Sequence, residues 1–124
     1  MTNQIVWVDI PATDLDRAIA FYSALLGTTV KKESFNDCSF GLLPHADTNI
    51  SGCIIPAQAD DISTKGPLVY LNVSGRIDQA IAVAENQGGQ LLEPKLNMGN
   101  HGLRAVILDS EGNRVALHSA PTSQ

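Results

Sequence analysis

Residues 5–10 read Ile-Val-Trp-Val-Asp-Ile, and residues 68–73 read Leu-Val-Tyr-Leu-Asn-Val. The two stretches match position by position: an aliphatic residue, Val, an aromatic residue, an aliphatic residue, Asp or Asn, and an aliphatic residue. Further along, Ala-Ile-Ala recurs at 18–20 and 80–82, and Gly27 recurs as Gly89. Because both matches occur in the same order, the sequence indicates an internal repeat with a period of about 60 residues.

The repeat divides the chain into two half-modules, residues 4–56 and 66–120, joined by a linker at 57–65. In each half, an alternating strand pattern precedes an apolar stripe with helical spacing, and three shorter strand-like segments follow. Each half therefore predicts the order βαβββ, and the fold class is α+β. Since a unit of about 60 residues buries only a marginal core alone, we expect the halves to pack as a single domain over 1–124 or to exchange partners in a homodimer.

Two local signals mark the ends of the elements. Thr13-Asp14-Leu15-Asp16 is similar to a capping box in which Asp replaces the usual Glu, so it predicts a helix start. Gly27 suits the end of that helix. The segment from Asp109 to Asn113 is rich in turn-forming residues and predicts a turn between the last two strands.

The composition excludes several classes of protein. The 124 residues contain 8 Lys and Arg against 13 Asp and Glu, for a net charge of -5, which disfavours a nucleic-acid partner. No apolar run approaches the roughly 18 residues that span a bilayer, and no basic-then-apolar leader opens the chain. Two cysteines are too few for a disulfide scaffold. We therefore expect a cytoplasmic domain that is not attached to a membrane.

The early helix and the late turn together carry a family resemblance. The pattern Asp-Leu-x-x-Ala-x-x-Phe-Tyr at 14–22 and the pattern Asp-x-x-Gly-Asn at 109–113 resemble those of the vicinal oxygen chelate superfamily. That superfamily includes glyoxalase I, bleomycin-resistance proteins and extradiol dioxygenases. The resemblance implies tandem βαβββ modules that form a cup-shaped mixed sheet, with helices on the convex side and a small-molecule ligand on the concave side. It is weak for any one activity, and it leaves open whether the chain is an enzyme.

The resemblance also implies four metal-ligand positions, which this sequence does not fill. Superfamily members that do metal chemistry hold a divalent ion with His or Glu. The corresponding positions here are Trp7, Leu68, with Val69 after a one-residue slip, Ala116, and a fourth near Cys53. Trp, Leu and Ala side chains offer no donor that such a cation accepts. We therefore predict that the family's metal site is absent, and we predict no cofactor.

Strand alternation assigns the two faces of the sheet independently of the resemblance. One set is uniformly aliphatic and suits a helix-covered face: Val6, Val8, Ile10, Val69, Leu71, Val73, Val115 and Leu117. The other set mixes aromatic, polar and charged groups: Ile5, Trp7, Asp9, Leu68, Tyr70, Asn72, Arg114, Ala116 and His118. We interpret the mixed face as a ligand cup. A subunit interface or a solvent-facing sheet is the alternative.

Three residues of the mixed face are candidates for catalysis. His118 is a natural general acid or base near neutral pH, and Asp9 or Tyr70 would assist it. This hypothesis describes a lyase or an isomerase that works by proton transfer. The alternatives for His118 are a hydrogen-bonded residue with no chemistry and an improvised metal ligand.

The remaining candidates would contact a ligand. Trp7 offers an apolar stacking surface in the cup. The other candidate ligand-binding residues are Asn72, Cys53, His101, Arg104 and Arg114. The alternatives are that Cys53 is an inert buried thiol, that His101 is a loop residue and that the arginines are surface residues.

A different function also stays open, namely the sequestration of a cationic drug-like molecule that the charge of -5 attracts. A cup filled by its own side chains would serve only assembly.

Overall fold

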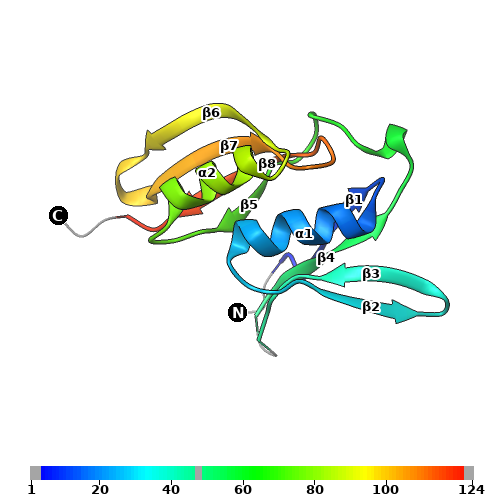
Figure 1. Cartoon of the computed structure of the whole chain (residues 1–124). Helices are drawn as coiled ribbons and strands as arrows, with labels where there is room; N and C mark the ends of the chain where they lie inside the picture. The colour runs from blue at the N-terminus through cyan, green and yellow to red at the C-terminus, as the bar shows by residue number, and fades with distance from the viewer. Residues whose placement is uncertain (1–3, 47–48, 122–124) are drawn as a thin grey trace.

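A computed structural model of the chain describes residues 4–46 and 49–121. It contains two four-stranded mixed sheets, each with one α-helix packed against it (Figure 1). The α+β class and the repeated βαβββ order predicted from the sequence are confirmed. Within the described residues, no helix is long and apolar enough to cross a membrane.

The first sheet has the strand order β1-β4-β3-β2, in which β1 and β4 are parallel. Its elements are β1 (Trp7–Ala12), α1 (Leu15–Leu26), β2 (Lys31–Phe35), β3 (Cys38–Leu42) and β4 (Ser51–Pro56). Helix α1 contacts β3 and β4, so it covers one face of this sheet. A short 3-10 turn, η1 (Ala59–Asp61), follows β4.

The second sheet repeats this arrangement with the order β5-β8-β7-β6, and β5 is parallel to β8. Its elements are β5 (Val69–Asn72), α2 (Ile77–Asn86), β6 (Gln90–Asn97), η2 (Gly99–His101), β7 (Leu103–Leu108) and β8 (Arg114–Ser119). Helix α2 contacts β6, β7 and β8, and it also contacts α1. The two helices therefore join the halves on one side, and we call the opposite face of each sheet its open face.

The core lies between the helices and the sheets. Most of the aliphatic set predicted for the helix-covered face is buried there, including Ile10, Val73 and Leu117. From α1, Phe21 and Leu25 fill the same core. Burial of such side chains provides the main driving force for joining the two halves, because each contributes about 1.5–3 kcal/mol when fully buried.

Three local expectations differ from the structure. Val6 is 71% exposed, because β1 begins only at Trp7, two residues later than the strand pattern at 5–10 predicted. The N-cap of the helix is Asp14 rather than Thr13, and its side chain accepts a hydrogen bond from the backbone N–H of Arg17. The Thr13 hydroxyl instead donates to Glu111. Ala116 is fully buried although alternation places it on the mixed face.

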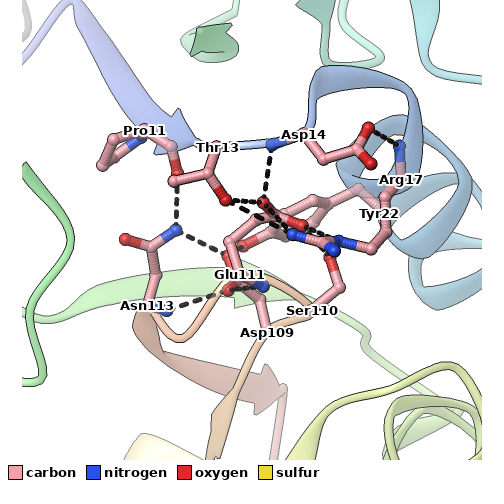
Figure 2. Close-up of polar contacts among 9 residues, drawn as sticks. All are labelled: Pro11, Thr13, Asp14, Arg17, Tyr22, Asp109, Ser110, Glu111 and Asn113. Atoms are coloured by element: carbon pink, nitrogen blue, oxygen red, sulfur yellow. Dashed lines mark hydrogen bonds and ion pairs between the residues drawn. The ribbon is translucent and has the colours of Figure 1, made fainter. Parts of the chain in front are cut away.

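A buried hydrogen bond ties the β7–β8 turn of the second half to α1 of the first half. The hydroxyl of Tyr22 donates to the Asp109 carboxylate at 2.6 Å, and both residues are almost completely buried (Figure 2). Burial, the Asp109 charge and this bond raise the pKa of Tyr22 well above its ordinary value, so the hydroxyl remains a donor. Asn113 donates both to Asp109 and, at 2.7 Å, to the backbone carbonyl of Pro11.

Glu111 extends the same contact to the start of α1 (Figure 2). Its carboxylate accepts from Arg17 Nε at 2.7 Å, from the backbone N–H of Asp14 at 2.9 Å and from Thr13 at 3.0 Å. Burial alone would raise the pKa of Glu111, but these hydrogen bonds together with one from Ser110 outweigh it and hold the pKa at about 2. The same pairing raises the pKa of Arg17. We call the residues that make these contacts the interhalf clasp. They are Pro11, Thr13, Asp14, Arg17, Tyr22, Asp109, Ser110, Glu111 and Asn113.

Removing the Tyr22 hydroxyl tests the buried part of the clasp. Tyr22→Phe keeps the ring against Phe21 but leaves the buried Asp109 carboxylate one donor short. We expect the free energy of unfolding to fall by about 1–3 kcal/mol, measured by urea denaturation. Tyr70→Phe is the matched control, because Tyr70 is 47% exposed and its loss should change stability by less than about 0.5 kcal/mol. Equal effects of the two substitutions would contradict the role given to Tyr22.

The depressed pKa of Glu111 predicts a pH dependence of stability. The folded-state pKa of about 2 lies below the ordinary 4.5, so the contribution is complete above pH 4.5 and is lost as the pH falls toward 2. Arg17 is half exposed, so solvent screens its charge and weakens the pair. We therefore expect this contribution to be on the order of 2 kcal/mol. In acid titrations of unfolding free energy, Glu111→Gln should flatten the curve in that window. The exposed Glu85→Gln serves as the control and should follow the wild type.

Candidate functional site

The open face of the second sheet brings four candidate residues together on adjacent strands. His118 on β8 lies opposite Asn72 on β5 and opposite Arg104 on β7. Register partners share a face, and Tyr70 lies two residues before Asn72, so all four side chains emerge on the open face. The rings of Tyr70 and His118 are in edge contact, with centroids 6.3 Å apart.

One hydrogen bond assigns the tautomer of the neutral His118 ring. Its Nε2 lies 2.7 Å from the backbone carbonyl oxygen of His101. A carbonyl oxygen only accepts, so we assign the proton to Nε2, which leaves Nδ1 of the neutral ring as a proton acceptor. His101 contributes through its backbone here.

Gly102 allows this approach of the loop to β8. Its φ is +90°, and a Cβ at this position would lie 2.2 Å from the carbonyl oxygen of Ser119 and 3.2 Å from His118 Nε2. Glycine is therefore required both for the backbone conformation and for the space beside the imidazole. The Gly-flanked loop at 98–102 thus serves to hold His118.

Tyr70 is held by Arg104. The Nη1 of Arg104 donates to the Tyr70 hydroxyl oxygen at 2.6 Å, and its Nη2 contacts Glu93 at 3.0 Å. The hydrogen bond from Arg104 to Tyr70 is the main cause that raises the pKa of Arg104. Because the Tyr70 oxygen accepts from Arg104, its own O–H remains available to donate to a ligand.

The open face of the first sheet carries a second group, made of Trp7, Asp9 and Cys53. Asp9 and Cys53 are register partners on β1 and β4. The Cys53 thiol donates to Asp9 at 3.2 Å and accepts from the Trp7 indole at 3.5 Å. His45 lies edge-on to Trp7, with ring centroids 6.0 Å apart. No sequence pattern predicts this contact, because His45 follows a proline in a loop.

The register relates the two groups to each other. The repeat aligns Trp7 with Tyr70 and Asp9 with Asn72, and the strand partners of Asp9 and Asn72 are Cys53 and His118. Cys53 therefore occupies in the first half the position that His118 occupies in the second. This correspondence follows from the parallel pairing of β1 with β4, which the sequence did not specify.

The structure separates some candidates that the sequence had grouped. Asp9 hydrogen-bonds within the first sheet, whereas Tyr70 and His118 lie on the second. Asn72 is on the open face beside His118, but its side-chain Oδ1 accepts a hydrogen bond from the backbone N–H of Ser74. Arg114 donates to the backbone carbonyl of Gly66, away from Arg104.

Two clefts run along the seam between the sheets. One, of about 400 Å³, lies between β1 and β5 and borders Tyr70 and Asn72. The other, of about 350 Å³, lies between β1 and the start of β8 and borders Asp9 and Arg114. Neither cleft reaches His118, so the imidazole lies on the open surface beside the first cleft rather than inside it.

The residues at the metal-ligand positions that the resemblance implies do not fit a divalent ion. Trp7, Leu68 and Ala116 offer no ligating atom, and Cys53 is already engaged by Trp7 and Asp9. His118, the register counterpart of Cys53, holds the His101 carbonyl through Nε2. Across residues 4–46 and 49–121, no group of three or more His, Cys, Asp or Glu side chains gathers in a metal-binding arrangement. We therefore derive no chemical step through a metal ion.

Comparison with known proteins identifies the family. The family model for the Glyoxalase/Bleomycin resistance protein/Dioxygenase superfamily matches residues 4–117. A glyoxylase-like domain-containing protein from Didymella fabae is 30% identical over 128 residues, which cover 96% of this chain and 95% of that protein. The chain belongs to this superfamily, the vicinal oxygen chelate superfamily that its motifs resemble.

Solved structures share the fold at low sequence identity. A glyoxalase/bleomycin resistance protein from Albidiferax ferrireducens has a TM-score of 0.69 at 20% identity, covering 96% of this chain and 100% of its own. A genomically encoded fosfomycin resistance protein from Listeria monocytogenes has a TM-score of 0.68 at 13% identity, covering 97% and 95%. At such identities the likeness establishes the fold and not the activity.

The environment of Cys53 predicts a slow thiol. Burial is the main cause that raises its pKa, and the bond to Asp9 acts in the same direction against the opposing Trp7 contact. Thiolate is the reactive form, so alkylation by iodoacetamide at pH 7.5 should modify the exposed Cys38 much faster than Cys53. Peptide mass analysis over time distinguishes the two. Faster labelling of Cys53 than of Cys38 would contradict this prediction.

Proposed function

We propose that this protein binds a small organic molecule on the open face of the second sheet and transfers a proton within it without the family's metal ion. The reaction class is that of an isomerase or a lyase. The hydrogen bond between His118 Nε2 and the His101 carbonyl is the observation that supports it most, because it presents Nδ1 as a base.

In this proposal His118 is the proton carrier. Its Nδ1 takes a proton from one atom of the ligand, and the resulting imidazolium returns it to another atom in an isomerisation. In a lyase reaction the imidazolium instead protonates the leaving group as the adjacent bond breaks. The His101 carbonyl stabilises the protonated ring, since it still accepts from Nε2 in that state.

Tyr70 and Arg104 would stabilise the negative charge that forms when the proton leaves. The free O–H of Tyr70 donates to the ligand atom that becomes charged, and Arg104, bonded to the Tyr70 oxygen at 2.6 Å, strengthens that donor. The sequence hypothesis offered Asp9 or Tyr70 as the partner of His118. We propose Tyr70, because Asp9 is bonded to Cys53 on the first sheet.

A screen followed by one pair of variants tests the proposal. Thermal-shift measurement with metabolites and antibiotics should yield compounds that raise the unfolding temperature. NMR of each such compound with the protein should then show conversion. His118→Gln should keep binding within about threefold and reduce turnover about 100-fold or more. Full turnover in His118→Gln would refute the proposal. So would compounds whose binding shifts only the protein resonances of the first sheet.

A second function has support on the first sheet. Trp7 is 41% exposed and lies on the same face as Asp9, which pairs an aromatic ring with a carboxylate. Such a pair attracts organic cations, and the chain's charge of -5 adds to this attraction. Sequestration of a cationic drug-like molecule predicts binding that weakens steeply with salt, that Trp7→Ala abolishes, and that produces no conversion.

We also propose that the protein is a cytoplasmic homodimer. Ile5, Val6 and Phe35 are 64%, 71% and 72% exposed, and a second copy would cover such apolar side chains. Sedimentation at micromolar concentration should give twice the mass of one chain.

The cytoplasmic location is supported by the two cysteines. Both are free thiols, which suits a reducing compartment.

A further inference from the structure

We propose that the cleft of about 350 Å³ between β1 and β8 binds a small carboxylic acid with an apolar body. This site is distinct from the open-face site of the second sheet. It lies on the seam of the two halves, where the β7–β8 turn and the segment 61–67 meet β1. Its volume is at the small end of the range of about 300–1,000 Å³ in which proteins hold small molecules.

Two cations line this cleft without an acidic partner. Arg114 and Lys65 both border it, and neither takes part in any ion pair found within the described residues. The guanidinium of Arg114 is held instead by the backbone carbonyl of Gly66, at 3.1 Å from Nη2. The two carboxylates that border the same cleft, Asp9 and Asp61, form no ion pair with either cation within the described residues.

Arg114 also retains unused hydrogen-bonding capacity. Its Nε is buried and has no hydrogen-bond partner in the described part of the chain. A buried donor without an acceptor is unfavourable, and a planar carboxylate is the group that best matches the fork of a guanidinium. A carboxylate that reached Nε and Nη2 together would form the two parallel N–H···O bonds that this fork favours.

The rest of the lining selects among anions. Val8, Val69 and Pro67 give the cleft apolar walls, which favour a ligand with a hydrocarbon or aromatic body. Asp9 and Asp61 also border it and would repel a dianion more than a monoanion. A carboxylate with one charge therefore fits better than a phosphate.

Titration of the full-length protein with benzoate tests this site. The readout is the ¹H–¹⁵N amide spectrum at constant ionic strength, with benzamide and benzylamine as ligands of the same size and different charge. We expect benzoate to give saturable shifts in β1, in 63–67 and at the start of β8. Benzamide and benzylamine should bind at least tenfold more weakly.

Variants assign the effect to the two cations. Arg114→Gln should weaken benzoate binding at least tenfold, and Lys65→Gln, which changes an exposed loop residue, should weaken it about threefold or more. Lys31→Gln, an exposed lysine on β2, is the matched control and should bind as the wild type does. His118→Gln should also leave benzoate binding unchanged, which separates this inference from the proposed function.

Three results would overturn the inference. These are the absence of saturable shifts with benzoate, equal or tighter binding of benzylamine, and unchanged benzoate affinity in both Arg114→Gln and Lys65→Gln. Inorganic phosphate that competes as strongly as benzoate would likewise contradict the selection for a monoanion.

Discussion

The hydrogen bond between Tyr22 and Asp109 is the contact on which the rest of the structure depends. It lies in the core, and it joins the helix of the first half to the final turn of the second. A buried carboxylate is tolerated only when its hydrogen bonds are satisfied, so this bond and the one from Asn113 fix the position of the turn. The turn leads directly into β8, the strand that carries His118, and the geometry of the open face therefore depends on the clasp.

The sequence predicted the fold well because its signals are local. The alternating strands and the cap at Gly27 each follow from neighbouring residues, and the repetition of these local patterns in the second half agrees with the βαβββ order. The site was less predictable because it depends on strand register and on backbone groups. The separation of Asp9 from His118, the pairing of Tyr70 with Arg104, and the His101 carbonyl as the partner of His118 arise only after the strands align. No sequence pattern marks Glu111 as the partner of Arg17 either, because the two residues lie 94 positions apart.

The two open faces show how a repeated fold acquires different chemistry in its halves. Cys53 and His118 occupy matching positions in register, yet one is a buried thiol with a raised pKa and the other a fixed imidazole. The positions that the family resemblance implies for a metal carry Trp7, Leu68 and Ala116, which offer no ligand atom. Charge stabilisation in the proposed reaction therefore rests on Tyr70 and Arg104, whose hydrogen bond is already formed in the structure.

The claim that the open-face site works without the family's metal is tested most directly by metal analysis. Protein produced without a metal-affinity tag would be incubated with zinc, manganese and nickel salts, dialysed and analysed for elements by mass spectrometry. We expect far less than one ion per chain, and the same low metal content in Cys53→Ser. One ion of a single metal per chain, removed together with ligand conversion by a chelator, would contradict it.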